Sequence, residues 1–295
     1  MNLQDGNDTA PPPRAASLDP LLPADIARKA EQIGVAKANM DPVRLFALAV
    51  LAGAFIGLGA MAATTLWSGT TGALPFGVAR MLGGLVFSLG LILVVLGGAE
   101  LFTGNNLMVM ALAGRRITVL ALLRAWGIVF VGNLVGALGT AVLVFLGGHH
   151  FLADGTVGAT ALAIGEAKAA LPPARAFFLG VLCNVLVCLA VWICYGARSM
   201  TDKVVVILFP VAAFVAAGFE HSVANMYFIP KGLLILWFAP ADFWALVDTS
   251  PEAYKALSLG GLVANLVPVT LGNIVGGGVL VGLVYWFVYL RRPEE

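Results

Sequence analysis

Glu220 and His221 are neighbours in a long apolar stretch, and of all the residues in this chain they could most readily do chemistry. The sixteen residues between Lys203 and Glu220 carry no formal charge, and Lys231 is the only charged residue between His221 and Asp242. An ionisable side chain inside a lipid-spanning helix is costly and usually faces a water-filled path or a partner. Histidine also changes its charge near neutral pH. The pair therefore predicts a functional site within a membrane; the alternative is a cap on an exposed helix end.

The composition predicts an integral membrane protein. Of the 295 residues, 60% are hydrophobic and 11% are charged, and the mean hydropathy is +0.95, whereas a soluble domain has about 25% charged residues. The net charge of +1 gives no electrostatic basis for binding nucleic acid. The three cysteines match neither a zinc spacing nor a disulfide framework, so we expect no metal site and no cofactor. The sequence also offers no nucleophile–base pair, so we expect no enzymatic activity.

Long uncharged runs predict six transmembrane helices. The runs are far longer than the 9–11 residues of a barrel strand and do not alternate, which favours helices. Twelve lysines and arginines fall on the side that carries both termini and five on the other, so we expect cytoplasmic termini. The spans lie within 44–80, 80–115, 124–154, 175–198, 203–242 and 256–290.

Residues 1–40 are predicted to form a cytoplasmic segment that precedes a channel domain over 41–295. Up to about residue 20 the segment has the composition of a disordered tail. Residues 24–40 then place Ile26, Ala30, Ile33 and Lys37 at helical spacing. This helix lies either on the membrane surface or against the cytoplasmic mouth of the protein. The stretch 147–173 shows no pattern, and we interpret it as a loop.

Two short motifs occur twice, in the same order. Residues 100–105 and 220–225 both read Glu-x-x-x-x-Asn, 120 positions apart, and Gly-Asn at 132–133 recurs at 272–273, 140 positions further on. A duplicated unit of three spans would insert its second copy upside down and place the transport path between the halves. The sequence therefore predicts an all-α membrane protein built from two inverted three-helix repeats.

Glycines beside the acidic motifs predict that the second and fifth helices are broken. Irregular backbone at membrane depth is tolerated where it lines a cavity and its amides find partners. Free amides and helix dipoles at such breaks favour a small anion. We expect Glu100, Glu220, Asn105 and Asn225 to bond the freed amides of the breaks rather than to bind substrate.

Six stretches, in order and at a consistent spacing, resemble the formate/nitrite transporter family of bacterial anion channels, and its formate-channel branch most closely. The similarity extends from about Pro42 to Arg291. It implies an aquaporin-like six-helix bundle in the bacterial inner membrane, assembled as a homopentamer with one pore in each protomer. The stretches are Phe87-Ser-Leu-Gly-Leu91, Glu100-Leu-Phe-Thr103, Gly132-Asn-Leu-Val-Gly-Ala137, Val187-Cys-Leu-Ala-Val-Trp192, Phe219-Glu-His-Ser-Val-Ala-Asn-Met226 and Gly272-Asn-Ile-Val-Gly-Gly-Gly278.

The resemblance also implies which residues form the pore. His221 and Thr103 would meet at its centre, Lys168 would stand in a vestibule, and Asn184 and Asn273 would flank the central site. Two apolar constrictions around the histidine would be formed by Phe87, Leu91, Leu101, Phe102 and Phe214.

A mechanism follows from the cost of moving an anion through an apolar constriction. A charged ion must lose its hydration there, whereas a neutral weak acid largely avoids that cost. We expect Lys168 and the helix dipoles to attract formate, protonation to occur near His221, and the Thr103 hydroxyl to orient the substrate or the imidazole.

Several alternatives remain open at this point. Nitrite and hydrosulfide are also small anions of weak acids, and either could be the substrate. An aquaporin-type pore for neutral solutes is less consistent, because the chain lacks two Asn-Pro-Ala-like loops. His221 could be only a structural donor to Asn273, and Lys168 could be an ordinary solvated loop lysine.

Overall fold

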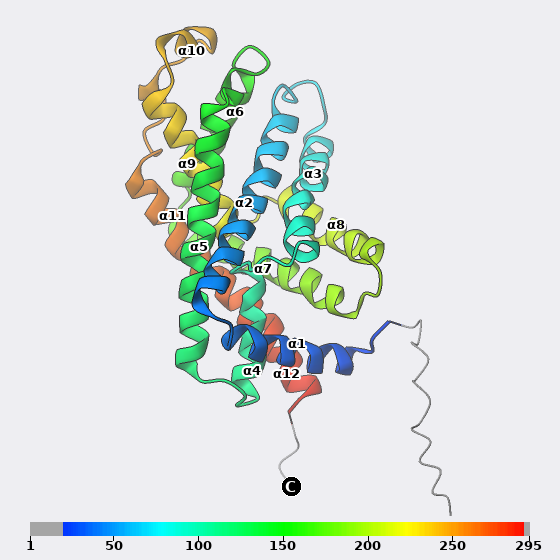
Figure 1. Ribbon diagram of the computed structural model, residues 1–295. Coiled ribbons are helices and arrows are strands. Elements are labelled where there is room, and N and C mark those ends of the chain that lie inside the picture. The colour runs from blue at the N-terminus through cyan, green and yellow to red at the C-terminus, as the bar shows by residue number, and fades with distance from the viewer. Residues whose placement is uncertain (1–19, 292–295) are drawn as a thin grey trace, which may run out of the picture.

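The computed structural model describes residues 20–291, and within that range all regular structure is helical. The predicted disordered tail, up to about residue 20, lies almost wholly outside the described residues. Figure 1 shows α1, α4 and α12 at one end of the molecule and α6, α10 and the α2–α3 connection at the other. In chain order the helices are α1 (Pro23–Ala38), α2 (Pro42–Trp67), α3 (Phe76–Leu96), η1 (Gly104–Met108), α4 (Val109–Ala113), α5 (Val119–Leu146), η2 (His149–Phe151), α6 (Thr156–Ala169), α7 (Pro173–Gly196), α8 (Met200–Ala216), α9 (Ser222–Phe238), α10 (Ala241–Leu246), η3 (Pro251–Ala253), α11 (Leu259–Asn273), η4 (Ile274–Leu283) and α12 (Val284–Tyr289).

Five helices are long and apolar enough to cross a membrane: α2, α3, α5, α7 and the continuous α11–η4–α12. The remaining predicted crossing is divided between α8 and α9, each of 17 residues. Large apolar side chains such as Leu120, Leu143 and Phe209 are exposed on the outward faces, as a lipid environment requires. The all-helical bundle of six crossings is confirmed.

The second and fifth crossings are broken where the sequence predicts. Helix α3 ends at Leu96, and the chain continues through an irregular stretch into η1 and α4. Helix α8 ends at Ala216, and α9 begins at Ser222. Gly98 and Gly218 have φ angles of +73° and +72°, a left-handed conformation that glycine adopts without strain. Each break thus begins with a glycine that turns the backbone out of its helix.

Two helices outside the six crossings cover the ends of the bundle. The apolar face of α1 packs on the protein, where Ile26, Ala27 and Ala30 contact Met110 and Trp192. At the opposite end, α6 occupies the stretch that the sequence analysis interpreted as a loop, and that interpretation was wrong. Its buried face is mostly glycine and alanine, which allows close packing on α9 but gives no hydrophobic stripe to recognise.

Candidate functional site

His221 and Thr103, which the resemblance implies lie close together, are in contact in the interior of the protein. Nε2 of His221 lies 3.0 Å from the hydroxyl oxygen of Thr103, so this contact joins the two helix breaks. Only 3% of His221 and none of Thr103 is exposed. On the other side of the ring, Nδ1 accepts the Ala224 amide at 3.1 Å and caps α9. Because Nδ1 is an acceptor here, the proton of the neutral ring is on Nε2, which donates to Thr103.

Two cavities reach the breaks and share no lining residue. The outer cavity, of about 300 Å³, is lined by the second break and ends at His221. The inner cavity, of about 170 Å³, is lined by the first break. We call them outer and inner according to the predicted orientation, in which α1 and α12 face the cytoplasm.

The predicted constriction residues fall on both sides of the His221–Thr103 contact. Phe87 and Phe214 line the outer cavity, where their rings meet edge to face and Phe214 stacks on the His221 ring with centroids 6.0 Å apart. Leu91 and Leu101 line the inner cavity. Phe102 lines neither cavity, because its ring packs against α5. An ion passing between the cavities would therefore meet apolar side chains on either side of one imidazole and one hydroxyl.

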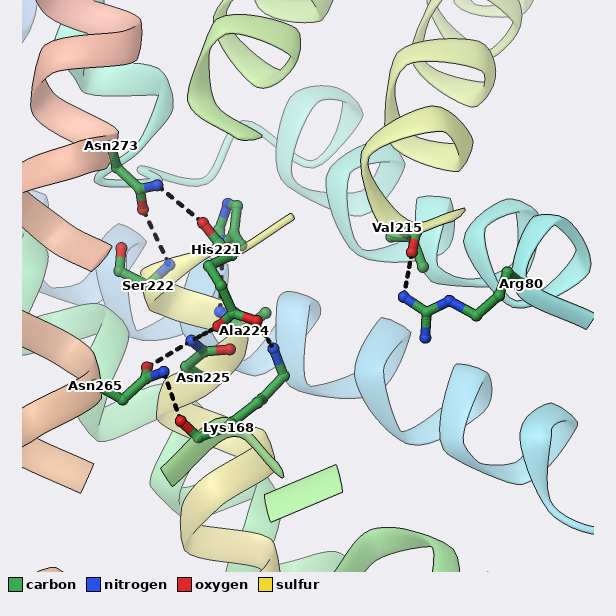
Figure 2. A network of polar contacts seen from close by, with 10 residues as sticks. Arg80, Lys168, Val215, His221, Ser222, Ala224, Asn225, Asn265 and Asn273 are labelled. Carbon is green, nitrogen blue, oxygen red and sulfur yellow. Dashed lines mark hydrogen bonds and ion pairs between the residues drawn. The ribbon is translucent and has the colours of Figure 1, made fainter. Parts of the chain in front are cut away.

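Asparagines on α5 and α11 hold the backbone of the two breaks. Asn133 donates to the carbonyls of Ala49 and Glu100 and accepts the Phe102 amide. In the same way, Asn273 donates to the carbonyls of Gly180 and Glu220 and accepts the Ser222 amide. The contact of Asn273 with the Ser222 amide can be followed in Figure 2. All of these bonds are made with backbone groups, so Asn273 supports the break beside the central site. Its hydrogen bonds do not include one to the His221 side chain.

The two glutamates of the repeated motif bind side chains rather than freed amides, contrary to the prediction. The Glu100 carboxylate accepts from Asn105 at 2.8 Å and pairs with Lys37 at 2.9 Å. The Glu220 carboxylate accepts from Asn225 at 2.6 Å and pairs with Lys168 at 2.8 Å. The backbone amides of both glutamates instead donate to the carbonyls of Leu48 and Leu179 on neighbouring helices. A buried carboxylate in lipid needs a counter-charge, and each mouth supplies a lysine.

Lys168 is therefore not a solvated loop lysine. It lies at the end of α6, only partly exposed, with its ammonium also over the ring of Phe228 at 5.5 Å from the centroid. Lys37 has the equivalent position at the inner mouth, where it also donates to Asn105. Sequence reasoning missed this role of Lys37. The signal was its place four residues after Ile33, in line with the buried face of α1.

Asn184 lies behind Thr103 rather than beside His221. Its side-chain nitrogen contacts three oxygens: the Thr103 carbonyl at 3.2 Å, the Asn106 side chain at 2.8 Å and the Asn273 carbonyl at 2.7 Å. The Cys188 thiol also donates to the Thr103 carbonyl, at 3.3 Å. Asn184 and Asn106 thus fix the backbone that carries the Thr103 hydroxyl. Asn106 was not recognised as a site residue from the sequence.

The described residues contain no group of three or more His, Cys, Asp or Glu side chains suited to a metal ion. What the central arrangement offers is hydrogen-bond donors, with the Nε2 proton of His221 bound to Thr103 and the Thr103 hydroxyl proton left free to be donated. These groups suit a small polar solute or anion that moves in single file.

Comparison with known proteins identifies a family. The profile described as "Formate/nitrite transporter" matches residues 24–287. The formate channel FocA of Escherichia coli K12 is 47% identical over 278 residues, which cover 94% of this chain and 97% of that protein. The formate channel FocA of Haemophilus influenzae is 42% identical and covers 89% of this chain and 93% of that protein.

Solved structures give the same result. A structure titled "Pentameric formate channel with formate bound" superposes with a TM-score of 0.78 at 42% identity, over 85% of this chain and 98% of that one. A second, titled "FNT family ion channel", has a TM-score of 0.77 at 31% identity, over 90% and 98% of the two chains.

Proposed function

Because this chain belongs to the formate/nitrite transporter family, we propose that it is a channel that carries formate across the bacterial inner membrane. The observation that carries the proposal is the buried His221–Thr103 contact, which lies between two cavities that approach it from opposite ends. The relatives named as formate channels support formate as the substrate. The relatives are named as channels, which also favours a channel over an enzyme.

We propose that transport is coupled to a proton. Formate that stays ionised would lose its hydration among Phe87, Phe214, Leu91 and Leu101, which costs several kcal/mol or more. Formic acid avoids most of this cost. The imidazole of His221 is the ionisable group at the contact between the cavities, so protonation at Nδ1, with release of the Ala224 amide, would prepare it to give its Nε2 proton to formate.

We propose that the protein assembles as a homopentamer with both termini in the cytoplasm. The solved channel with formate bound is titled as pentameric, which supports this assembly. The ends of α1 and α12 lie at the same end of the bundle, as cytoplasmic placement of both requires (Figure 1).

Substitution of His221 tests the role of the proton. The His221→Asn variant retains a side-chain oxygen to cap α9 and an amide to donate, but it cannot take up a proton. We expect it to fold as the wild type does. The rate of proton-coupled formate uptake should fall roughly tenfold or more, a factor that corresponds to the energy of one charge-assisted hydrogen bond. The measurement is formate uptake into proteoliposomes together with internal pH, with nitrite and hydrosulfide compared in parallel.

A second variant separates transport from folding. His221→Phe removes the cap of α9 as well as the proton carrier. It should therefore also lower the free energy of unfolding by about 1 kcal/mol, which is seen as a lower thermal unfolding midpoint in detergent. Proton-coupled uptake at the wild-type rate in His221→Asn would contradict the proton role and leave the histidine as a cap and donor. Faster uptake of nitrite or hydrosulfide than of formate by the wild type would reassign the substrate.

A further inference from the structure

The two cavities differ in charge. The charged residues that line the outer cavity are Arg80, Lys168, Arg175 and Glu220, which gives three cations and one carboxylate. The inner cavity is lined by one charged residue of each sign, Lys37 and Glu100. The outer cavity is thus net positive by two charges and the inner cavity is balanced.

The Lys168 charge is already matched within the outer cavity. Its ammonium is 2.8 Å from the Glu220 carboxylate, so an arriving anion meets a pair rather than a free cation. Lys37 is matched by Glu100 in the same way at the inner mouth. The excess positive charge of the outer cavity therefore belongs to Arg80 and Arg175, of which Arg175 is exposed and Arg80 is half-buried.

Arg80 is fixed in place without a carboxylate partner. One nitrogen of its guanidinium donates to the carbonyl of Val215, in the last turn of α8, and the group lies 5.0 Å from the ring centroid of Trp67. Among residues 20–291 it forms no ion pair. Figure 2 shows Arg80 standing apart from the Lys168 and Asn273 network, with its contact to Val215 as the bond drawn. A guanidinium has five N–H donors, so most remain for a ligand.

Arg80 also stands at the entrance to the path. It lines both the outer cavity that ends at His221 and a wider basin of about 660 Å³ between the α2–α3 connection and α6. An anion that moves from the basin toward His221 passes the guanidinium. The planar fork of arginine matches a carboxylate with two parallel hydrogen bonds, which an ammonium cannot make.

We infer that Arg80 is the residue that captures the substrate carboxylate at the outer mouth, and that the outer face consequently saturates at a lower formate concentration than the inner face. The inference rests on the proposed function. With equal pH on both sides of the membrane, the pathway has the same permeability in both directions at low formate concentration, so the difference appears in half-saturation at each face and not in a preferred direction of flux.

The test uses right-side-out and inside-out membrane vesicles from a host without its own formate channels. In each we would measure the initial rate of radiolabelled formate uptake against formate concentration for the wild type, Arg80→Gln and Arg80→Lys. The matched control is Arg116→Gln, an exposed arginine in the short connection between α4 and α5. Gln keeps a donor for the Val215 carbonyl but removes the charge.

For Arg80→Gln we expect the half-saturating concentration at the outer face to rise about tenfold, the size of one charge-assisted hydrogen bond, and that at the inner face to change less than about twofold. Arg80→Lys keeps the charge and loses the fork, so a smaller rise of about threefold is expected, and it replaces Arg80→Gln if that variant does not fold. Outer-face uptake by the wild type should also weaken at high salt more than uptake by Arg80→Gln.

An unchanged half-saturation at the outer face in Arg80→Gln, or an equal rise at both faces, would overturn the inference. A rise of the same size in Arg116→Gln would overturn it as well. Absence of wild-type formate uptake in both vesicle types would instead refute the proposed function, so the two failures are distinguishable.

Discussion

At the scale of single residues, the centre of the protein is where equivalent positions of the two halves differ. His221 corresponds to Leu101 and Thr103 to Val223, each 120 positions apart, as are Glu100 and Glu220. The carbonyls of residues 48 and 49 bond to the first break and its support, and those of residues 179 and 180, 131 positions later, do the same for the second. By this spacing, Asn184 corresponds to Gly53. The three polar members form one cluster with Asn106. Positions that hold the breaks therefore match between the two copies of the motif, and the positions that form the central His221–Thr103–Asn184 cluster do not.

The Asn184 cluster depends on the absence of a side chain at Gly277. A Cβ there would lie 2.3 Å from the Asn184 nitrogen and 2.5 Å from the Cys188 sulfur. We expect Gly277→Ala to displace Asn184 from the Thr103 carbonyl, to lower stability by about 1–3 kcal/mol and to reduce formate uptake. Thermal unfolding in detergent and uptake into proteoliposomes measure the two effects.

Gly139 supplies the control, because a Cβ at that helical glycine meets nothing within 4 Å in the chain. Gly139→Ala should leave uptake unchanged and raise stability by up to about 1 kcal/mol, the helix propensity difference. If Gly277→Ala behaved like Gly139→Ala, the packing of Asn184 against η4 would not matter for the pore.

At the scale of elements, each helix break is held by its neighbours in the bundle rather than by its own glutamate. Asn133 and Asn273 each satisfy one carbonyl and one amide of a break, and each also donates to a carbonyl of the neighbouring helix α2 or α7. An unsatisfied buried group costs about 1–3 kcal/mol. The two asparagines are consequently among the side chains on which the broken crossings depend most.

Replacement by leucine should show this directly. We expect Asn133→Leu and Asn273→Leu each to destabilise the protein by several kcal/mol, seen as a lower thermal unfolding midpoint and a lower yield of folded protein. Asn39→Leu, at an exposed asparagine that bonds one carbonyl at the end of α1, should change the midpoint little. Equal effects of the three variants would show that the bonds to the breaks carry no special weight.

The elements that the sequence made predictable are those with a strong local signal. Charge-free runs, glycines and repeated Glu-x-x-x-x-Asn motifs predicted the six crossings and the two breaks, whereas the proximity of His221 and Thr103 was implied by the family resemblance. Helix α6 was not predicted, because its packing face consists mostly of small residues and gives no hydrophobic periodicity. The partners of Glu100 and Glu220 escaped because Lys37 and Lys168 lie more than fifty residues away in the chain, and only tertiary packing brings them together.

At the scale of the whole molecule, the distribution of charge predicts which end faces the cytoplasm. Arg115, Arg116, Arg198 and Lys203 were all assigned to the side of the termini, and arginine and lysine accumulate on the cytoplasmic side of membrane proteins. The three native cysteines are at most 2% exposed, so single introduced cysteines can report orientation without their removal.

Cysteine labelling in intact cells tests this orientation. A membrane-impermeant maleimide should label Thr71→Cys, in the exposed α2–α3 connection, and should label Arg116→Cys only after the membrane is permeabilised. Labelling of Arg116→Cys but not Thr71→Cys in intact cells would reverse the orientation, and with it the face at which Arg80 stands.

The support of each break by its own half bears on how the protein is made. Asn133, Leu48 and Lys37 satisfy the first break, and all three have been synthesised before α6 leaves the ribosome. Chains fold from the amino terminus during synthesis, and a bare peptide group in lipid costs several kcal/mol. The backbone groups of the first break can therefore already have their hydrogen-bond partners when the nascent first half enters the bilayer. The contacts of Thr103 with Asn184 and His221 form only after the second half has been synthesised.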